Sequence, residues 1–222
     1  MRQAIHSKDL YHLLRDKHPA NGHWPAETPW EMMLGSFLVQ NTTWMNTKKS
    51  LNQLREATGF DPATIASLDK DTLIQLIYSS GFHQNKSQLI HYFFTWLGEY
   101  DFDLERIKQD LGTQEPLRER LLSFRGIGLE TADVLLLYAF EEPAFIADNY
   151  ARKLYRTLEC PAADSYDHLK AFVEDSTTLT VPEWQQFHIQ ILDYGKRYLK
   201  GKPPYQEPLS EQYYIATPDS VE

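Results

Sequence analysis

The chain is poor in cysteine and lacks long apolar runs, and both shortages exclude classes of protein. Cys160 is the single cysteine among 222 residues, so no disulfide can form within the chain. No apolar run reaches the roughly 18 residues that a membrane-spanning helix needs. The segment 1–18 has no apolar signal-peptide core. We therefore expect a cytoplasmic protein that does not enter a membrane.

Positive charge is also in short supply. Lys and Arg total 22 against 31 Asp and Glu, which gives a net charge of −9. Phosphate contacts dominate affinity for DNA, so this balance disfavours DNA binding overall. Charges are screened beyond about 10 Å at moderate salt, however, so local clusters matter more than the total. Two clusters of basic residues, typical either of solvated helix ends or of a DNA-facing surface, are Arg152, Lys153 and Arg156, and Lys196, Arg197, Lys200 and Lys202.

Most of the chain shows helical patterning. Segments such as WEMMLGSFLVQ, SQLIHYFFTWLGEY and PEWQQFHIQILDYGKRYL place apolar residues three and four positions apart, whereas convincing two-residue alternation is missing. Asp61 followed by Pro62 indicates a helix start, and Gly81 and Gly112 indicate helix ends. The pattern predicts an all-α fold, with an irregular polar tail over 203–222.

A tight Gly-x-Gly turn, Gly126-Ile127-Gly128, separates two helical segments near the middle of the chain. Glycine permits positive φ and close backbone approach. The first N–H groups of the helix that follows lack internal partners, and with the helix dipole they form a site for an anion. The two glycines alone are more typical of an ordinary helix–turn–helix than of an anion site, so the surrounding pattern must decide.

That surrounding pattern resembles the helix-hairpin-helix DNA glycosylases of the endonuclease III superfamily. LLSFRGIGLETADVLLLYAF (121–140) is similar to the family's hairpin, and Ala147-Asp148 stands where the family has Val-Asp at its catalytic carboxylate. MLGSFLVQNTTW (33–44) and SSGFHQNKSQLI (79–90) resemble two earlier family segments in the same order. The resemblance covers about residues 24–200.

The resemblance implies two helical lobes with the active site in the cleft between them. The central lobe would be 29–140, with its hairpin at 117–140, and the second lobe would combine 1–28 with 141–222. The implied partner is damaged double-stranded DNA, and we expect the protein to be a monomer.

The resemblance also implies roles for individual residues. Asp148 would stabilise the oxocarbenium-like sugar and orient water, while also serving as a helix N-cap. Gln40, or instead Asn41, would fill the gap left by an extruded base. Lys86 would either meet a phosphate or be exposed. The N–H groups of Ile127 and Glu130 would bind a DNA phosphate. The full set of residues expected at this phosphate is Arg125, Gly126, Ile127, Gly128, Glu130 and Thr131.

Two departures from the family pattern narrow the prediction. Glu130 stands where bifunctional members carry a Lys that forms a Schiff base, which implies a monofunctional enzyme that uses water. Glu130 is also favoured in a first helical turn by the helix dipole. Many members hold an iron–sulfur cluster with four cysteines, but 195–214, the corresponding stretch, has none. We therefore expect no cluster, metal or other cofactor.

With both departures, the chain resembles the bacterial 3-methyladenine DNA glycosylases, which lack the iron–sulfur cluster. A 3-methylated adenine is cationic, and an aromatic face attracts a cation by about 0.5–2 kcal/mol. Trp24 and Trp44 would supply such faces, although ordinary core packing explains them equally well. The residues that the resemblance places at the base pocket are His23, Trp24, Pro25, Trp44, Lys196 and Lys202.

The sequence therefore predicts a DNA glycosylase that hydrolyses the N-glycosidic bond of alkylated bases flipped out of duplex DNA. One alternative is an endonuclease III-like enzyme that removes oxidised pyrimidines and nicks the strand. Another is a non-catalytic sensor of distorted DNA.

Overall fold

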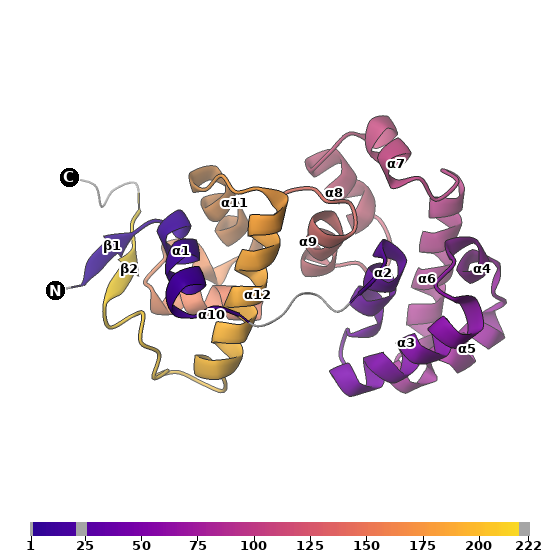
Figure 1. Ribbon diagram of the computed structural model, residues 1–222, viewed down its shortest axis with the longest axis horizontal. Helices are drawn as coiled ribbons and strands as arrows, with labels where there is room; N and C mark the ends of the chain where they lie inside the picture. The colour runs from indigo at the N-terminus through magenta and orange to yellow at the C-terminus, as the bar shows by residue number, and fades with distance from the viewer. Residues whose placement is uncertain (1, 21–25, 218–222) are drawn as a thin grey trace. The chain divides into compact units, whose positions relative to one another are not determined.

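The computed structural model describes residues 2–20 and 26–217, which are mostly helical (Figure 1). The all-α fold predicted from the sequence is confirmed. The chain forms two compact units, Pro25–Glu142 and Met1–Trp24 with Pro143–Glu222. The division into lobes at 29–140 and 1–28 plus 141–222 stays a prediction. Within the described residues, no helix combines the length and apolarity needed to cross a membrane.

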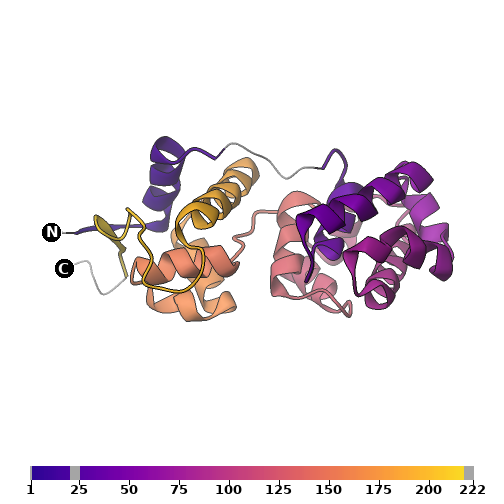
Figure 2. The same cartoon turned by 90° about the horizontal axis from the view of Figure 1, so that it is seen from below.

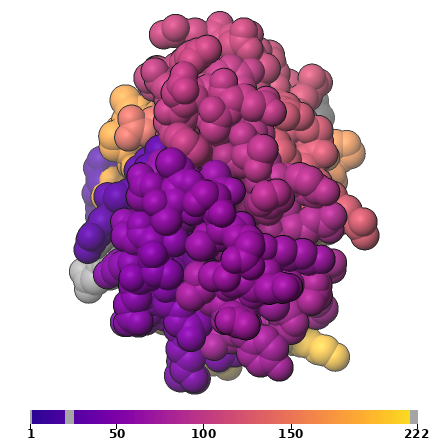
Figure 3. All heavy atoms as spheres, turned by 90° about the vertical axis from the view of Figure 1, so that its right-hand side faces the viewer, coloured from indigo at the N-terminus to yellow at the C-terminus, as the bar shows by residue number. Residues whose placement is uncertain are grey.

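The unit Pro25–Glu142 is built from consecutive helices joined by short turns (Figures 1 and 2). Figure 3 shows its face on the side of α4, α5 and α7, where side chains from early and late parts of the unit meet in one packed surface. The helices are α2 (Pro29–Leu38), α3 (Trp44–Thr58), α4 (Pro62–Ser67), α5 (Lys70–Ile77), the 3-10 helix η1 (Tyr78–Ser80), α6 (His83–Gly98), α7 (Leu104–Leu111), α8 (Glu115–Leu122) and α9 (Leu129–Tyr138).

Polar N-caps set where several of these helices begin. Thr28 and Thr43 start α2 and α3 by accepting a hydrogen bond from the backbone N–H three residues ahead. Asp61 starts α4 in the same way, with Pro62 as the first helical residue, as the sequence predicted. Each such cap stabilises its helix by about 1 kcal/mol. Gly112 ends α7 with φ +92°, which confirms the predicted stop.

The core of this unit is aromatic around α2 and α6. The Phe37 ring on α2 meets the Phe93 ring on α6 edge-on, with centroids 5.1 Å apart. Phe93 also packs at 5.1 Å against Phe124, which lies between α8 and α9. Such edge-to-face pairs add to the stabilisation from burial. The residue that leads into the Gly-x-Gly turn is therefore anchored in the core.

The second unit combines the two ends of the chain. Its short strands β1 and β2 pair in parallel, with Ile5 opposite Ile215 (Figures 1 and 2). Its core contains the buried rings of Tyr11, Tyr155 and Phe187. The elements are β1 (Gln3–Ile5), α1 (Ser7–Lys17), α10 (Asn149–Thr157), the 3-10 helix η2 (Pro161–Asp164), α11 (Tyr166–Ser176), α12 (Val181–Tyr198) and β2 (Tyr213–Ile215).

The prediction of an irregular polar tail over 203–222 is wrong at β2, whereas the other described residues of that segment form turns and irregular chain. Leu209 and Ile215 are buried, and the latter lies in β2. The Glu207 carboxylate accepts hydrogen bonds from the Tyr194 hydroxyl at 2.6 Å and from the Leu209 N–H at 3.0 Å. A few apolar residues and one buried carboxylate thus hold a polar-looking segment against α12.

Candidate active site

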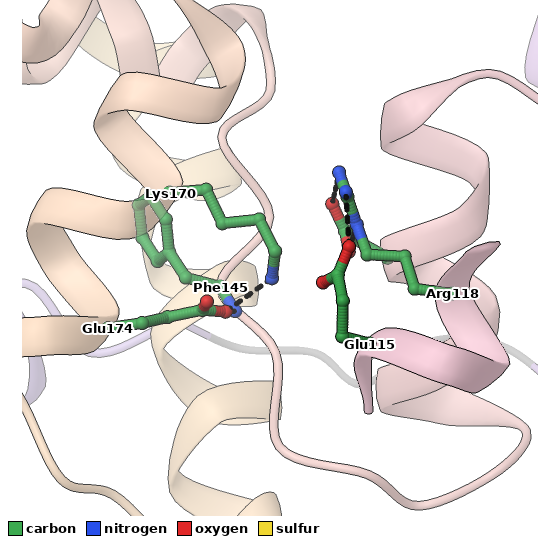
Figure 4. A network of polar contacts seen from close by, with 6 residues as sticks. Glu115, Arg118, Phe145, Lys170 and Glu174 are labelled. Atoms are coloured by element: carbon green, nitrogen blue, oxygen red, sulfur yellow. Dashed lines mark hydrogen bonds and ion pairs between the residues drawn. The ribbon is translucent and has the colours of Figure 1, made fainter. Parts of the chain in front are cut away.

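The two helices of the hairpin are joined by a buried ion pair. Arg118 on α8 donates to Asp133 on α9 through Nε to Oδ1 at 2.8 Å and through Nη2 to Oδ2 at 3.3 Å. Asp133 is 0% exposed. Glu115 lies 3.7 Å from Arg118 Nη1, and Figure 4 shows both side chains on the same helix. Paired charge-assisted bonds of this kind fix the relative position of the two helices as well as holding them together.

The turn between the helices requires glycine at Gly126. Its φ of +104° is a conformation that other residues avoid. A Cβ there would also lie 3.3 Å from Leu89 Cδ2 on α6. The Ile127 N–H donates to the Phe124 carbonyl at 3.0 Å and closes the turn. The expectation that this N–H serves a phosphate is therefore wrong for this conformation, because the turn uses it.

The backbone at Gly128, in contrast, does not require glycine. Its backbone is extended, with φ −97° and ψ 179°, so its conformation suits any residue. A Cβ there would have no atom within 4 Å. Gly128 is the N-cap of α9, which begins without a side-chain cap. A helix N-terminus whose cap residue has no side chain can receive an anion. Arg125, in the turn itself, is exposed.

Gln40, predicted to fill the gap beside an extruded base, contacts the hairpin. Its Nε2 donates to the Gly126 carbonyl and to the Thr131 hydroxyl, each at 3.2 Å. Asn41, the next residue, is exposed and has a positive φ of +53°. In this arrangement Gln40 supports the turn and Asn41 presents the amide at the corner between α2 and α3.

A pocket of about 330 Å³ lies beside this corner. The side chains of Phe82 and Tyr92, both well exposed, form part of its rim. The residues that line the pocket are Gln40, Asn41, Phe82, Asn85, Lys86, Gln88, Leu89, Tyr92, Arg125 and Gly126.

Lys86 is neither exposed nor placed to meet a phosphate, so both expectations for it are wrong. Its Nζ is buried and donates to the Leu38 carbonyl, at the end of α2, and to the Ser80 carbonyl, each at 2.8 Å. Burial lowers the pKa of Lys86 to about 8. The side chain thus joins the segments that lead to Asn41 and Phe82.

Asp148 is the N-cap of α10, as predicted. Its Oδ1 accepts a hydrogen bond from the Ala151 N–H at 2.7 Å, and the residue is 6% exposed. Two of the basic residues that follow it make contacts within their unit. Arg156 pairs with Asp164 at 2.8 Å, and Lys153 donates to the carbonyls of residues 199 and 201 beyond the end of α12.

The residues predicted for the base pocket do not all fall in one unit. Trp44 is the first residue of α3 and is 42% exposed. Lys196 and Lys202 are exposed in the other unit. His23, Trp24 and Pro25 lie outside the described residues. Assignment of the set to a base pocket stays a prediction.

Gly195 is a structural residue that the sequence reasoning missed. A Cβ on Gly195 would lie 2.4 Å from the Tyr150 ring, so glycine allows α12 to approach the start of α10 closely. Tyr150 follows Asp148 by two residues. The sequence signal for such a close approach is a glycine inside the otherwise helical pattern DYGKRY.

Comparisons with known proteins agree on one family. Residues 34–176 match the family described as HhH-GPD superfamily base excision DNA repair protein. A protein provisionally named as a DNA repair glycosylase in Methanocaldococcus jannaschii is 31% identical over 195 residues, which cover 87% of this chain and 88% of that protein. Endonuclease III of Thermotoga maritima is 24% identical over 191 residues, covering 84% and 80%.

A solved structure shares both the fold and part of the sequence. The crystal structure of the 3-methyladenine DNA glycosylase of H. pylori, bound to 1,N6-ethenoadenine, superimposes with a TM-score of 0.71 and 25% identity. The match covers 87% of this chain and 98% of that chain. The resemblance found in the sequence motifs is confirmed.

We expect the two hairpin glycines to differ in their response to alanine. Gly126→Ala should lower the free energy of unfolding by about 1–2 kcal/mol, because a Cβ disfavours the left-handed backbone. Gly128→Ala should change it by less than about 0.5 kcal/mol, because the entropy gained from alanine in an extended conformation is offset by its lower preference for the N-cap position. Urea unfolding of both variants beside wild type measures this, and equal losses would contradict it.

Burial of Lys86 predicts a pH dependence of stability. Its pKa is lowered from 10.5 to about 8 in the folded state, so the folded protein binds this proton more weakly than the unfolded chain. The resulting destabilisation is fully present below about pH 8 and disappears as the pH rises towards 10.5. The free energy of unfolding of wild type should therefore rise relative to Lys86→Met over this range.

The matched control is Lys49→Met, which removes an exposed lysine on α3. This control gives the pH dependence that results from removing an exposed lysine, and the rise relative to Lys86→Met should exceed it. No excess over the control would show that the Lys86 ammonium is not destabilised by burial.

Proposed function

Because the chain belongs to the HhH-GPD superfamily of base excision DNA repair proteins, we propose that it is a DNA glycosylase acting on alkylated, 3-methyladenine-type bases in duplex DNA. The observation that carries the proposal is the hairpin, whose glycine turn leads into α9 without a side-chain cap. The likeness to a 3-methyladenine DNA glycosylase supports an alkylated purine as the substrate.

The hairpin supplies the proposed contact with the DNA backbone. A phosphate meets the N-terminus of α9 beside Gly128, where the absence of a Cβ leaves open space. The helix dipole favours the negative charge, and the exposed Arg125 adds a nearby cation. The net charge of −9 opposes binding at longer range, so affinity should be moderate and strongly dependent on salt.

Asp148 is the proposed catalytic residue. The bond from the Ala151 N–H holds its carboxylate in a defined position at the start of α10. As the bond between base and sugar breaks, positive charge develops on the sugar, and a nearby carboxylate stabilises it and orients the attacking water. A methylated base already carries positive charge and leaves readily, so the reaction needs no separate general acid.

Hydrolysis by water follows from the residue at position 130. A Schiff base requires an amine, and the Glu130 carboxylate cannot form one. Lys153, the lysine that follows Asp148 most closely, donates to the Leu199 carbonyl at 3.1 Å. We therefore propose a monofunctional enzyme that leaves an intact strand with an abasic site.

The proposed enzyme works without an iron–sulfur cluster. A four-cysteine cluster does not fit the chain, whose single cysteine is Cys160. Cys160 is buried, and this burial raises the pKa of its thiol, which disfavours the thiolate that a metal would bind. Among the described residues, no group of three or more His, Cys, Asp or Glu side chains is placed to hold a metal.

The contacts with the damaged site rest on the corner between α2 and α3. Asn41 offers an exposed amide that can both donate and accept, which suits it to replace lost base pairing, while Gln40 supports the hairpin. Trp44, partly exposed at the start of α3, offers an aromatic face to a cationic base.

The direct test is base release from duplex DNA treated with a methylating agent. Wild type should release 3-methyladenine, with strand breaks appearing only after alkali, because water is the nucleophile. Asp148→Asn should keep the N-cap yet lower the rate by at least about 100-fold, because it removes the negative charge that stabilises the sugar. Chromatography of the freed bases, with gels before and after alkali, measures both.

Other outcomes point to the other two functions. Strand breaks without alkali, with an enzyme–DNA adduct trapped by borohydride, would establish an endonuclease III-like lyase and refute the argument from Glu130. Equal binding of damaged duplex by wild type and Asp148→Asn, with no base released by either from alkylated, oxidised or deaminated DNA, would indicate a sensor instead.

A further inference from the structure

The segment that leads into Asp148 runs as extended chain through the core of its unit. Residues 143–147 form neither helix nor strand, yet Phe145, Ile146 and Ala147 are all buried. The Phe145 ring packs against three other rings, with each pair of centroids 5.9 Å apart. These rings are those of Tyr155, Trp184 and Phe187. A buried extended segment needs hydrogen-bond acceptors from elsewhere in the fold.

Glu174 on α11 supplies one of these acceptors. The Phe145 N–H donates to Glu174 Oε1 at 2.7 Å, and Lys170, one turn earlier on α11, pairs with the same oxygen. Figure 4 shows the Glu174 carboxylate close to both the Lys170 ammonium and the Phe145 backbone. The Glu174 side chain is 32% exposed and that of Lys170 is 11% exposed, so the bond lies at the edge of the core. A carboxylate accepts such a bond more strongly than a neutral group.

This contact holds the backbone shortly before Asp148. Downstream, the Asp148 carboxylate is fixed by its bond to the Ala151 N–H. Upstream, three residues earlier, the backbone is fixed by Glu174. Since a catalytic group displaced by about 1 Å can lose 100-fold in rate, both fixed points bear on where the Asp148 carboxylate lies.

We propose that Glu174 is a positioning residue for Asp148, acting through the Phe145 N–H and held in place by Lys170. The proposal rests on the proposed function, because it assigns Glu174 a role in the same reaction. It requires an acceptor oxygen at the reach of a glutamate side chain, and it does not require a negative charge at the reacting atoms.

Two substitutions separate the position of the acceptor oxygen at residue 174 from its negative charge. Glu174→Gln keeps an acceptor oxygen at the same distance but removes the charge. Glu174→Asp keeps the charge but draws the oxygen back by one methylene. The single-turnover rate of base release from methylated duplex should stay within about threefold of wild type for Glu174→Gln. For Glu174→Asp the rate should fall about tenfold or more. Affinity for duplex containing an uncleavable abasic-site analogue should stay within about twofold for both variants, because the proposal gives Glu174 no contact with DNA.

Asp175→Asn, which changes an exposed charge at the next position of α11, is the matched control and should behave as wild type. Thermal unfolding of all variants shows whether each is folded at the assay temperature. If Glu174→Asp is unfolded, hydrogen exchange at the Phe145 amide of Glu174→Gln tests the bond between Phe145 and residue 174. Its exchange rate should match that of wild type.

The reverse order of rates, with Glu174→Gln slow and Glu174→Asp close to wild type, would overturn the proposal and indicate a role for the negative charge itself. Wild-type rates in both variants would overturn it outright, as would faster exchange of the Phe145 amide in a Gln variant that keeps its rate. Failure of the proposed function is distinguishable, since wild type itself would then release no base.

Discussion

The turn at Gly126 is the constraint on which the candidate site depends. Its left-handed backbone lies against Leu89 on α6, and the Ile127 N–H closes it on the Phe124 carbonyl. Phe124 is packed against the aromatic core, and the Arg118–Asp133 ion pair fixes the two helices on either side. A change in this turn would move the start of α9, the support from Gln40 and one wall of the pocket together.

The two candidate functional helices begin in opposite ways, and each beginning suits its proposed role. α10 begins with Asp148, which satisfies a backbone N–H with its own carboxylate. α9 begins with Gly128, which has no side chain to do so. Because glycine at an N-cap costs only roughly a few tenths of a kcal/mol relative to a side-chain cap, α9 can begin without one at little cost in stability. Its first N–H groups then suit the proposed phosphate contact.

Local patterns were enough to predict the helices, the hairpin and the capping role of Asp148, because caps and turns depend on residues close in sequence. Contacts between distant segments were not predictable in this way. β2 forms because Tyr213–Ile215 pair with Gln3–Ile5, more than two hundred residues earlier. The burial of Lys86 depends on carbonyl groups of two separate segments. Glu174, likewise, has no sequence signal linking it to Asp148.

A crystal structure of the protein bound to duplex DNA that carries an uncleavable abasic-site analogue tests the central claim most directly. The account predicts a DNA phosphate within hydrogen-bond distance of backbone N–H groups at the N-terminus of α9, beside Gly128, and the Asp148 carboxylate facing the sugar of the analogue. DNA bound to a different surface, with the hairpin facing solvent, would contradict it.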